Sequence, residues 1–330
     1  MKKKLLIGLI GLACITTIAS AKTIKIGTGG VTGNYYGMVQ DLLREDYCGN
    51  ALGTDRNGEK NVGEIISGTG SVKNLKGLIT KKMAIGIVQA DVLFSTKKRT
   101  PRKVNEKKLK VIAELHPETF HLLIPKNFKP KNQSSNSSLW GNIMKKVGVS
   151  KKRQVAKKIS LNSLRGETIA SWGGSSVSAS ALSQFFKLNW NVKNIPEGER
   201  KGLTGIPILL VGGAPYAPVQ EYLDSGNYTL VGIDHSKIAE KAPFYIKMNA
   251  NYEVNGNPLF VPSIGVRAIL LGKTYRSKKR EKVMHEFSKC VMDVLPDLAD
   301  DDETNSNWSV VYDLNEQDSS SMNWATFPID

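Results

Sequence analysis

A glycine-rich segment between a strand pattern and a helix pattern constrains the fold of this chain more than any other feature. Thr23–Ile26 alternates polar and apolar residues, as a strand does, and 27–33 then contains four glycines. From Tyr36 to Tyr47, apolar residues recur at helical spacing along one face. A strand, a glycine loop and a helix in this order direct free backbone N–H groups toward an anion or a polar ligand.

This segment does not have the spacing of a dinucleotide-binding loop. That loop needs glycine or alanine at the position of Thr32, and an acidic residue at the end of a second strand about 20 residues further on. Neither residue is present. The sequence therefore excludes a dinucleotide site and predicts a different polar ligand.

Two later segments extend the pattern. Residues 70–75 are Gly-Ser-Val-Lys-Asn-Leu, and 88–91 are Val-Gln-Ala-Asp at the end of the predicted strand 84–88. Together with Thr-Gly-Gly-Val-Thr-Gly-Asn-Tyr-Tyr at 28–36, they resemble three motifs of the TAXI-type solute receptors of tripartite ATP-independent periplasmic (TRAP) transporters. Weaker similarity continues to about residue 295.

The resemblance implies a fold and a function. The fold would be α/β and two-lobed, periplasmic-binding-protein-like (type II), with a hinge and a central cleft. The function would be capture of a glutamate- or glutamine-like amino acid, a 2-oxoacid or a dicarboxylate. The partner would be the membrane subunit of a TRAP transporter, which an ion gradient drives without ATP.

The chain also departs from the TAXI pattern in three places. The glycines of the second loop, 173–176, are shifted, and Ile206-Pro207 stands where the family has an acidic residue. The usual His-Pro-Gly-Ala segment near the C-terminus is absent.

The beginning of the chain has the composition of a secretory signal peptide. Lys2–Lys4 is followed by the apolar run 5–18 and by Ala19-Ser20-Ala21, a typical cleavage site. We expect a signal peptide over 1–21, cleavage near Ala21 and a periplasmic mature protein. No later run is long and apolar enough to span a bilayer.

Alternating strand and helix patterns predict an α/β organisation. We expect 22–124 to form the first part of lobe 1 and 161–235 to form lobe 2. Residues 236–330 are expected to form a hinge return and the second part of lobe 1, with an acidic C-terminal tail. Between them, 125–160 is predicted to be a basic insertion with few apolar residues. Further expectations are two strands at 109–115 and 119–125, a basic loop over 95–108 and a short helix at 140–147.

The charge is strongly basic, with a formal net charge of +16. A basic chain can bind nucleic acid, but export and the lack of aromatic residues among the lysines argue against it. We expect most of these lysines to form a solvated surface. Contact with anionic lipid or an acidic partner is the alternative.

Two cysteines follow the signal peptide, Cys48 and Cys290. They can pair in an oxidising compartment. Because Cys290 lies on an apolar helical stripe, we favour a buried free thiol. Two cysteines and four histidines without ligand-like spacing provide no metal site, and we expect no metal and no cofactor.

Motifs of catalysis are also missing, so we expect a binding protein and not an enzyme. There is no Gly-x-Ser-x-Gly or His-Glu-x-x-His segment. Ser95-Thr96-Lys97-Lys98 matches Ser-x-x-Lys only within a lysine run. His116, beside Pro117 and Glu118, could face the cleft, but we favour a turn residue.

The candidate ligand-binding residues follow from the loops and the resemblance. They are Thr28, Gly29, Gly30, Asn34, Tyr35, Ser71, Asn74, Gln89, Ser175, Ser176, Gly213 and Tyr216. They supply neutral donors and acceptors, and two of them are tyrosines with a flat apolar face. Each also has a structural explanation, such as a tight turn for the glycines or a helix cap for Asn74. Asp91 is as well explained by capping as by ligand contact.

Two other functions remain open at this point. One is a ligand-sensing periplasmic module that signals to a membrane receptor, which a neighbouring sensor-kinase gene would support. The other is a basic, secreted surface-binding protein, which salt-dependent binding to anionic vesicles would reveal.

Overall fold

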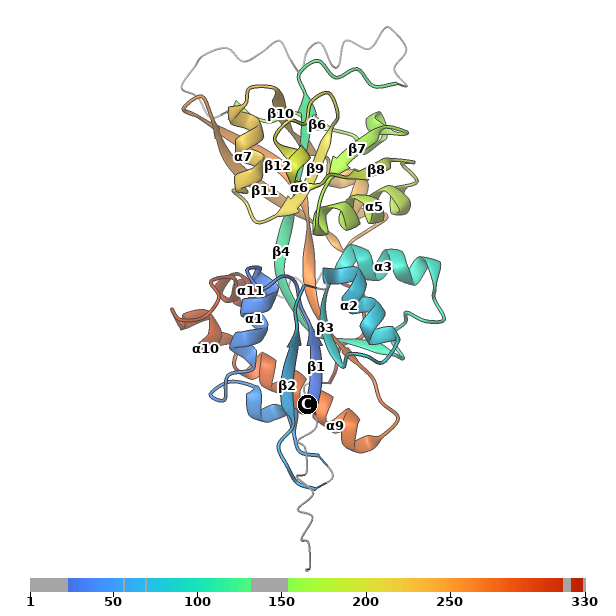
Figure 1. Cartoon of the computed structure of the whole chain (residues 1–330), viewed down its shortest axis with the longest axis vertical. Helices are drawn as coiled ribbons and strands as arrows, with labels where there is room; N and C mark the ends of the chain where they lie inside the picture. The colour runs from blue at the N-terminus through green and yellow to red at the C-terminus, as the bar shows by residue number, and fades with distance from the viewer. Residues whose placement is uncertain (1–22, 56, 69, 132–153, 317–321, 329–330) are drawn as a thin grey trace, which may run out of the picture.

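Two α/β lobes, stacked along the long axis and joined by two long strands, make up the computed structural model of the chain (Figure 1). The structure describes residues 23–55, 57–68, 70–131, 154–316 and 322–328. Strands β4 (Leu109–Pro125) and β12 (Asn257–Lys273) are 17 residues each and run through both lobes. The predicted two-lobed α/β fold is therefore confirmed.

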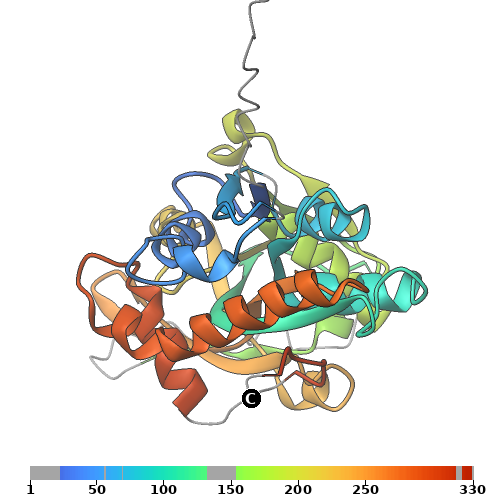
Figure 2. The same cartoon turned by 90° about the horizontal axis from the view of Figure 1, so that it is seen from below.

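Lobe 1, the lower lobe in Figure 1, has the strand order β2-β1-β3-β12-β4. The first three strands are parallel, and β12 is antiparallel to both β3 and β4. Its other elements are β1 (Thr23–Gly27), α1 (Asn34–Leu42), η1 (Gly49–Leu52), β2 (Val62–Ile66), α2 (Gly70–Ile79), β3 (Ile85–Gln89), α3 (Ala90–Arg99), α9 (Lys278–Asp293), α10 (Leu295–Asp300) and α11 (Asn307–Glu316). Figure 2 shows α9 (orange) crossing the molecule as seen from below.

Lobe 2 continues the same sheet in the order β4-β9-β7-β8. Strand β10 pairs with β4, and β11 forms a long antiparallel hairpin with β12. Its elements are β5 (Gln154–Val155), β6 (Lys158–Ile159), η2 (Leu161–Leu164), β7 (Thr168–Ser171), α5 (Gly174–Phe186), β8 (Asn191–Asn194), α6 (Glu197–Arg200), β9 (Ile208–Gly212), α7 (Ala217–Asp224), β10 (Tyr228–Ile233), α8 (Ser236–Ala239) and β11 (Tyr245–Val254).

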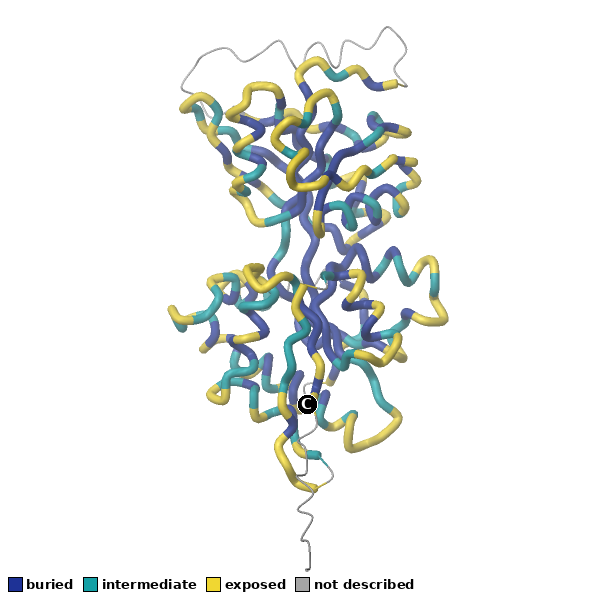
Figure 3. The backbone as a smooth tube through the Cα atoms, viewed as in Figure 1, coloured by how far each residue is buried: buried dark blue, intermediate teal, exposed yellow. Residues whose placement is uncertain are grey.

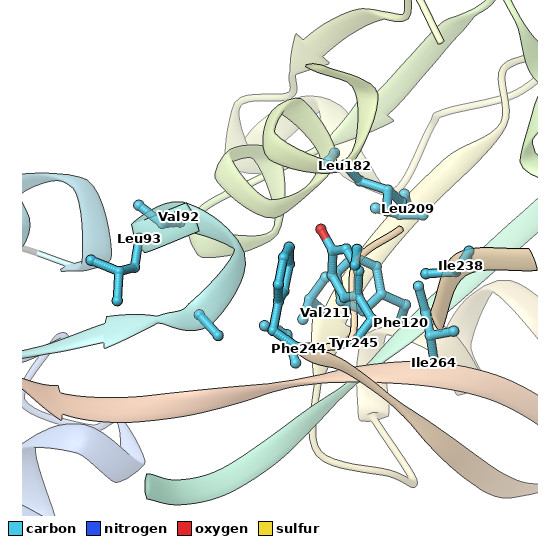
Figure 4. Packing of buried hydrophobic residues seen from close by; sticks show 14 of the residues in the cluster. Val92, Leu93, Phe120, Leu182, Leu209, Val211, Ile238, Phe244, Tyr245 and Ile264 are labelled. Atoms are coloured by element: carbon cyan, nitrogen blue, oxygen red, sulfur yellow. The ribbon is translucent and has the colours of Figure 1, made fainter. Parts of the chain in front are cut away.

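The apolar core is continuous through the junction of the lobes, as the buried path along β4 and β12 shows (Figure 3). One cluster joins Val92 of α3 in lobe 1 to Leu182 of α5 and Leu209 of β9 in lobe 2. Phe120 of β4 lies within it, with its ring 5.5 Å from that of Tyr245 (Figure 4). The two lobes are therefore packed against each other on the side of α3 and α5.

The two strands expected at 109–115 and 119–125 are one strand, β4, so the predicted turn at His116 is wrong. Pro117 is opposite Arg267 of β12, next to a register shift between Arg267 and Ile269, and such an irregularity tolerates a missing N–H. The expected basic loop at 95–108 is also wrong in its first part, because Ser95–Arg99 belongs to α3. Acidic Asp91 in the first turn and basic residues in the last turn complement the macrodipole of this helix.

A disulfide joins Cys48 to Cys290, with their Cα atoms 5.8 Å apart. The expectation of a free thiol is therefore wrong. The apolar stripe of α9 does pack on the core, but Cys290 lies at its edge, against the turn that carries Cys48. The bond fastens α9 to the segment that follows α1.

Several predictions fall on residues that the structure does not describe. These are the signal peptide and the short helix at 140–147. The segment that follows 132–153 pairs with lobe 2, since β5 pairs with β12 and β6 with β10. Within the described part of the chain, no helix is long and apolar enough to cross a membrane.

Candidate functional site

The first glycine loop lies where β1 ends, at the edge of lobe 1 that faces lobe 2 (Figure 1). Buried Thr28 donates its backbone N–H to Ile66 O at 3.0 Å, at the end of neighbouring β2. The amides of Gly68 and Gly70 donate to Gly29 O (2.6 Å) and Thr28 O (3.0 Å). The two sequence motifs at 28–36 and 70–75 therefore form one hydrogen-bonded unit.

Asn74 holds this unit together. It is fully buried, and its Nδ2 donates to Thr28 O at 3.1 Å and to Ile87 O at 2.8 Å. A Cβ at Gly27 would lie 2.5 Å from Asn74 Oδ1, so this close approach requires glycine. These contacts give Asn74 a structural role, in place of the ligand contact expected for it.

Gln89 connects the two lobes. Its Nε2 donates to Glu118 Oε2 on β4, and its Oε1 accepts from Ser71 Oγ of lobe 1 at 3.3 Å. The same Oε1 accepts from Ser178 Oγ of α5, in lobe 2, at 3.2 Å. Of these residues, sequence analysis missed Glu118 and Ser178, because their proximity to Gln89 depends on how the lobes pack.

Two carboxyl groups at this junction have raised pKa values. Burial raises the pKa of Glu118 to about 7, and the charge of nearby Asp91 adds to the shift. Burial raises the pKa of Asp91 to about 6, although it accepts hydrogen bonds from Val92 N (2.7 Å) and from Tyr245 OH (3.4 Å). A charged carboxylate is therefore costly here unless a ligand supplies a positive group.

Polar atoms without partners lie beside these carboxyl groups. Both ring nitrogens of His116 are buried and have no hydrogen-bond partner among the described residues. The buried Tyr35 hydroxyl makes no hydrogen bond within 3.5 Å, and the polar group that acts on it is the Glu118 carboxyl. The two rings are 5.8 Å apart. Burial, and then the charge of Glu118, raise the pKa of Tyr35, while burial lowers the pKa of His116 to about 4, so this imidazole is neutral at pH 7. Buried polar groups left unpaired cost stability, and at binding sites a ligand satisfies them.

The predicted residues of lobe 2 divide into two groups. Ser175 Oγ donates to Val211 O (3.2 Å) and accepts from Val211 N (2.9 Å), and Ser176 Oγ donates to Gly173 O (2.8 Å). These hydroxyls are occupied by their own loop and strand. Tyr216 lies close enough to Glu118 for that charge to add to the effect of burial, which raises the tyrosine's pKa.

The structure thus brings Tyr35, Gln89 and Tyr216 together around Glu118. We call these four residues, with His116 and Ser178, the interlobe junction.

Three other predicted residues, Gly30, Asn34 and Gly213, are exposed. Arg267, a buried cation of β12, is paired with Glu114 at 2.7 Å. In the described chain, no group of three or more His, Cys, Asp or Glu residues is placed to hold a metal ion.

A cavity of about 680 Å³ opens between the C-terminal parts of α3 and α5. Its lining includes Lys98, Arg99, Arg165 and Lys187, and none of the residues predicted from the sequence. This cavity is therefore not the predicted ligand site, whose position follows from the residues of the junction.

The fold is similar to several solved structures. One is a periplasmic sulfonate-binding protein from Methylobacillus flagellatus KT (TM-score 0.44, 10% identity, 92% of this chain and 79% of that one). Another is an amino acid ABC transporter substrate-binding protein from Streptococcus pneumoniae bound to L-arginine (0.41, 9%, 91% and 96%). A third is a TRAP periplasmic solute-binding protein from Haemophilus influenzae with bound L-gulonate (0.38, 11%, 92% and 86%). At these identities and TM-scores, no function is inferred from them.

Comparison with curated proteins yields no match. The family comparison gives a match over residues 26–309, which runs from β1 to the start of α11. It therefore includes both lobes, both long strands and every residue of the interlobe junction. The chain belongs to the NMT1-like family.

Proposed function

We propose that this protein is an exported TAXI-type solute receptor. It captures a small carboxylate-bearing metabolite between its lobes and delivers it to the membrane subunit of a TRAP transporter. The classes expected from the sequence are glutamate- or glutamine-like amino acids, 2-oxoacids and dicarboxylates. Among these, the interlobe junction favours an amino acid.

The observation that carries this choice is Glu118. Its carboxyl group lies at the junction and has a pKa of about 7, raised by burial and by the nearby charge of Asp91. It makes no ion pair within 4.0 Å with any cation of the described residues. A ligand ammonium group would stabilise the ionised form of Glu118. A dicarboxylate or a 2-oxoacid would instead bring a further negative charge to it.

The carboxylate of the ligand requires a different environment. The loop at 28–33 leads into the first turn of α1, whose N-terminal N–H groups and positive dipole end suit an anion. Tyr35 lies in that first turn, and its hydroxyl, close to Glu118 but without a hydrogen bond within 3.5 Å, can contact the same ligand. An amino acid matches this arrangement, because its carboxylate would bind the end of α1 and its ammonium group would bind Glu118.

The test is a thermal-shift screen of L-amino acids, 2-oxoacids and dicarboxylates. At a hundredfold excess over its dissociation constant, a ligand stabilises the folded state by ~2.7 kcal/mol. We expect an amino acid to give the largest shift. Its affinity should rise with pH and level off above about pH 7, because an ammonium group binds only the ionised Glu118.

Glu118→Gln is the diagnostic variant, because it removes the charge and keeps an acceptor for Gln89. We expect it to weaken amino-acid binding at least tenfold and to abolish the pH dependence. Glu253→Gln is the matched control, since it removes the same charge from an exposed position of β11. Tight binding of a dicarboxylate that Glu118→Gln leaves unchanged would contradict the proposed ligand class.

A further inference from the structure

A cavity of about 620 Å³ lies at the opposite end of the lobe 1 sheet. Its walls come from the amino end of β1, the turn between α2 and β3, the turn between β12 and α9, and the segment before β2. The cavity is lined by six basic residues: Lys25, Lys81, Lys82, Lys273, Lys279 and Arg280. Only one acidic residue, Asp55, is among its lining residues. We call this the basal pocket.

Most of these cations have no counter-ion. Lys25 pairs with Glu64 at 3.7 Å, and Lys279 Nζ donates to the backbone oxygen of Asp55 at 2.6 Å. The other four make no ion pair with any described carboxylate. The pocket therefore concentrates positive charge that the protein itself does not neutralise.

Tyr275 and Lys273 show how crowded the charges are. Lys273 Nζ lies 4.7 Å from the centre of the Tyr275 ring, and the Arg280 guanidinium lies 5.7 Å from it. Partial burial, followed by the charges of Lys81 and Arg280, lowers the pKa of Lys273. An anion in the pocket would reverse this effect, because it would stabilise the charged form of all three cations.

Asn61 supplies an independent observation. Its side chain is only 7% exposed and lines the same pocket. Its Nδ2 donates to Leu52 O at 2.7 Å, but its Oδ1 has no partner among the described residues. A buried acceptor of this kind calls for a donor such as a hydroxyl group.

We propose that the basal pocket binds a phosphate-bearing anion, through Lys81, Lys273 and Arg280, with a neighbouring hydroxyl group donating to Asn61. A phosphate group suits several converging cations, since it carries up to two charges and three strong acceptor oxygens. A soluble phosphate ester and the headgroup of phosphatidylglycerol share this chemistry. The site does not depend on the ligand of the interlobe junction, which lies at the other end of the sheet.

The test uses two probes in low-salt buffer. Inorganic pyrophosphate is titrated into the protein by calorimetry, and flotation measures binding to vesicles of phosphatidylglycerol and phosphatidylcholine. The diagnostic variant is Lys81→Gln/Arg280→Gln. Its matched control is Lys103→Gln/Lys107→Gln, which removes two charges from exposed positions of the same lobe, outside the pocket.

We expect pyrophosphate to bind, with at least a tenfold loss in Lys81→Gln/Arg280→Gln and less than a twofold loss in the control. Pyrophosphate binding without vesicle binding identifies a soluble phosphate ester. Vesicle binding that only the pocket variant loses identifies a lipid headgroup as the source of the phosphate. Failure of both probes, or equal losses in the two variants, overturns the proposal.

Discussion

The two ends of the lobe 1 sheet are electrostatic opposites. At the carboxyl ends of its parallel strands, the interlobe junction holds Glu118 with its pKa raised to about 7. At the amino ends, the basal pocket holds Lys273 with its pKa lowered. Both shifts move the group toward its neutral form. In each place burial removes water from a charge, and a like charge lies nearby.

The comparison teaches how one sheet can carry two kinds of polar site. The carboxyl ends meet the other lobe, so their side chains are buried and bonded to one another, as Gln89 is to Glu118 and Ser178. The amino ends face outward, and short basic turns surround an open cavity. A ligand of opposite charge would relieve the cost in each case, a cation at the junction and an anion at the base.

Breaking the disulfide should have the largest effect and should distinguish the two ends. We expect Cys48→Ser/Cys290→Ser to lower the free energy of unfolding by about 3–5 kcal/mol, since the bond closes a loop of 242 residues. Urea denaturation measures this. Pyrophosphate binding should weaken more than amino-acid binding, because the bond holds α9, which begins at the basal pocket. Unchanged stability relative to the oxidised wild type would show that the bond does not hold α9 in place.

Removing the Glu118 charge should have an intermediate effect that depends on pH. The folded protein keeps a proton on Glu118 up to about pH 7, whereas the unfolded chain releases it near the ordinary pKa of 4.5. The ligand-free wild type should therefore lose stability as pH rises from about 4.5 to 7. At pH 8, Glu118→Gln should be more stable than the wild type by about 1–3 kcal/mol, and equal to it at pH 4. Thermal unfolding measures this; the same gain in Glu253→Gln would contradict the role of burial.

Removing two cations from the basal pocket should have the smallest effect on stability, and this effect should depend on salt. Without ligand, Lys81→Gln/Arg280→Gln should raise the free energy of unfolding by ~0.5 kcal/mol at low ionic strength, because like charges repel each other. The gain should disappear in 1 M salt, which screens charges at the surface. Urea denaturation at two salt concentrations tests it; a loss of stability at low salt would show that the pocket is not electrostatically crowded.

Local sequence patterns predicted the elements near the junction well. The strands β1 and β3, the helix α1 and the loop between β1 and α1 follow from periodicity and glycine placement. The same patterns failed at His116, because a His-Pro-Glu sequence favours a turn locally. Pairing with β12 overrides that preference and extends β4 through both lobes.

Of the candidate site, the sequence located the loops but not the roles of their side chains. Tyr35, Gln89 and Tyr216 were predicted and lie around Glu118. Asn74 was predicted beside them, and its amide is instead bonded to two backbone carbonyls. A motif shows that a polar residue stands at a position, but its hydrogen-bond partners come from distant segments.

The sequence by itself determined the strand–loop–helix units and the strong positive charge, because both depend on neighbouring residues or on composition. Only the tertiary structure decided where charge becomes costly. Asp91 is 27 residues from Glu118 in the sequence, yet its charge raises the pKa of Glu118. Lys81 and Arg280 are 199 residues apart, yet both lower the pKa of Lys273. Burial and the proximity of like charges arise when distant segments pack together, and these two effects create both proposed sites.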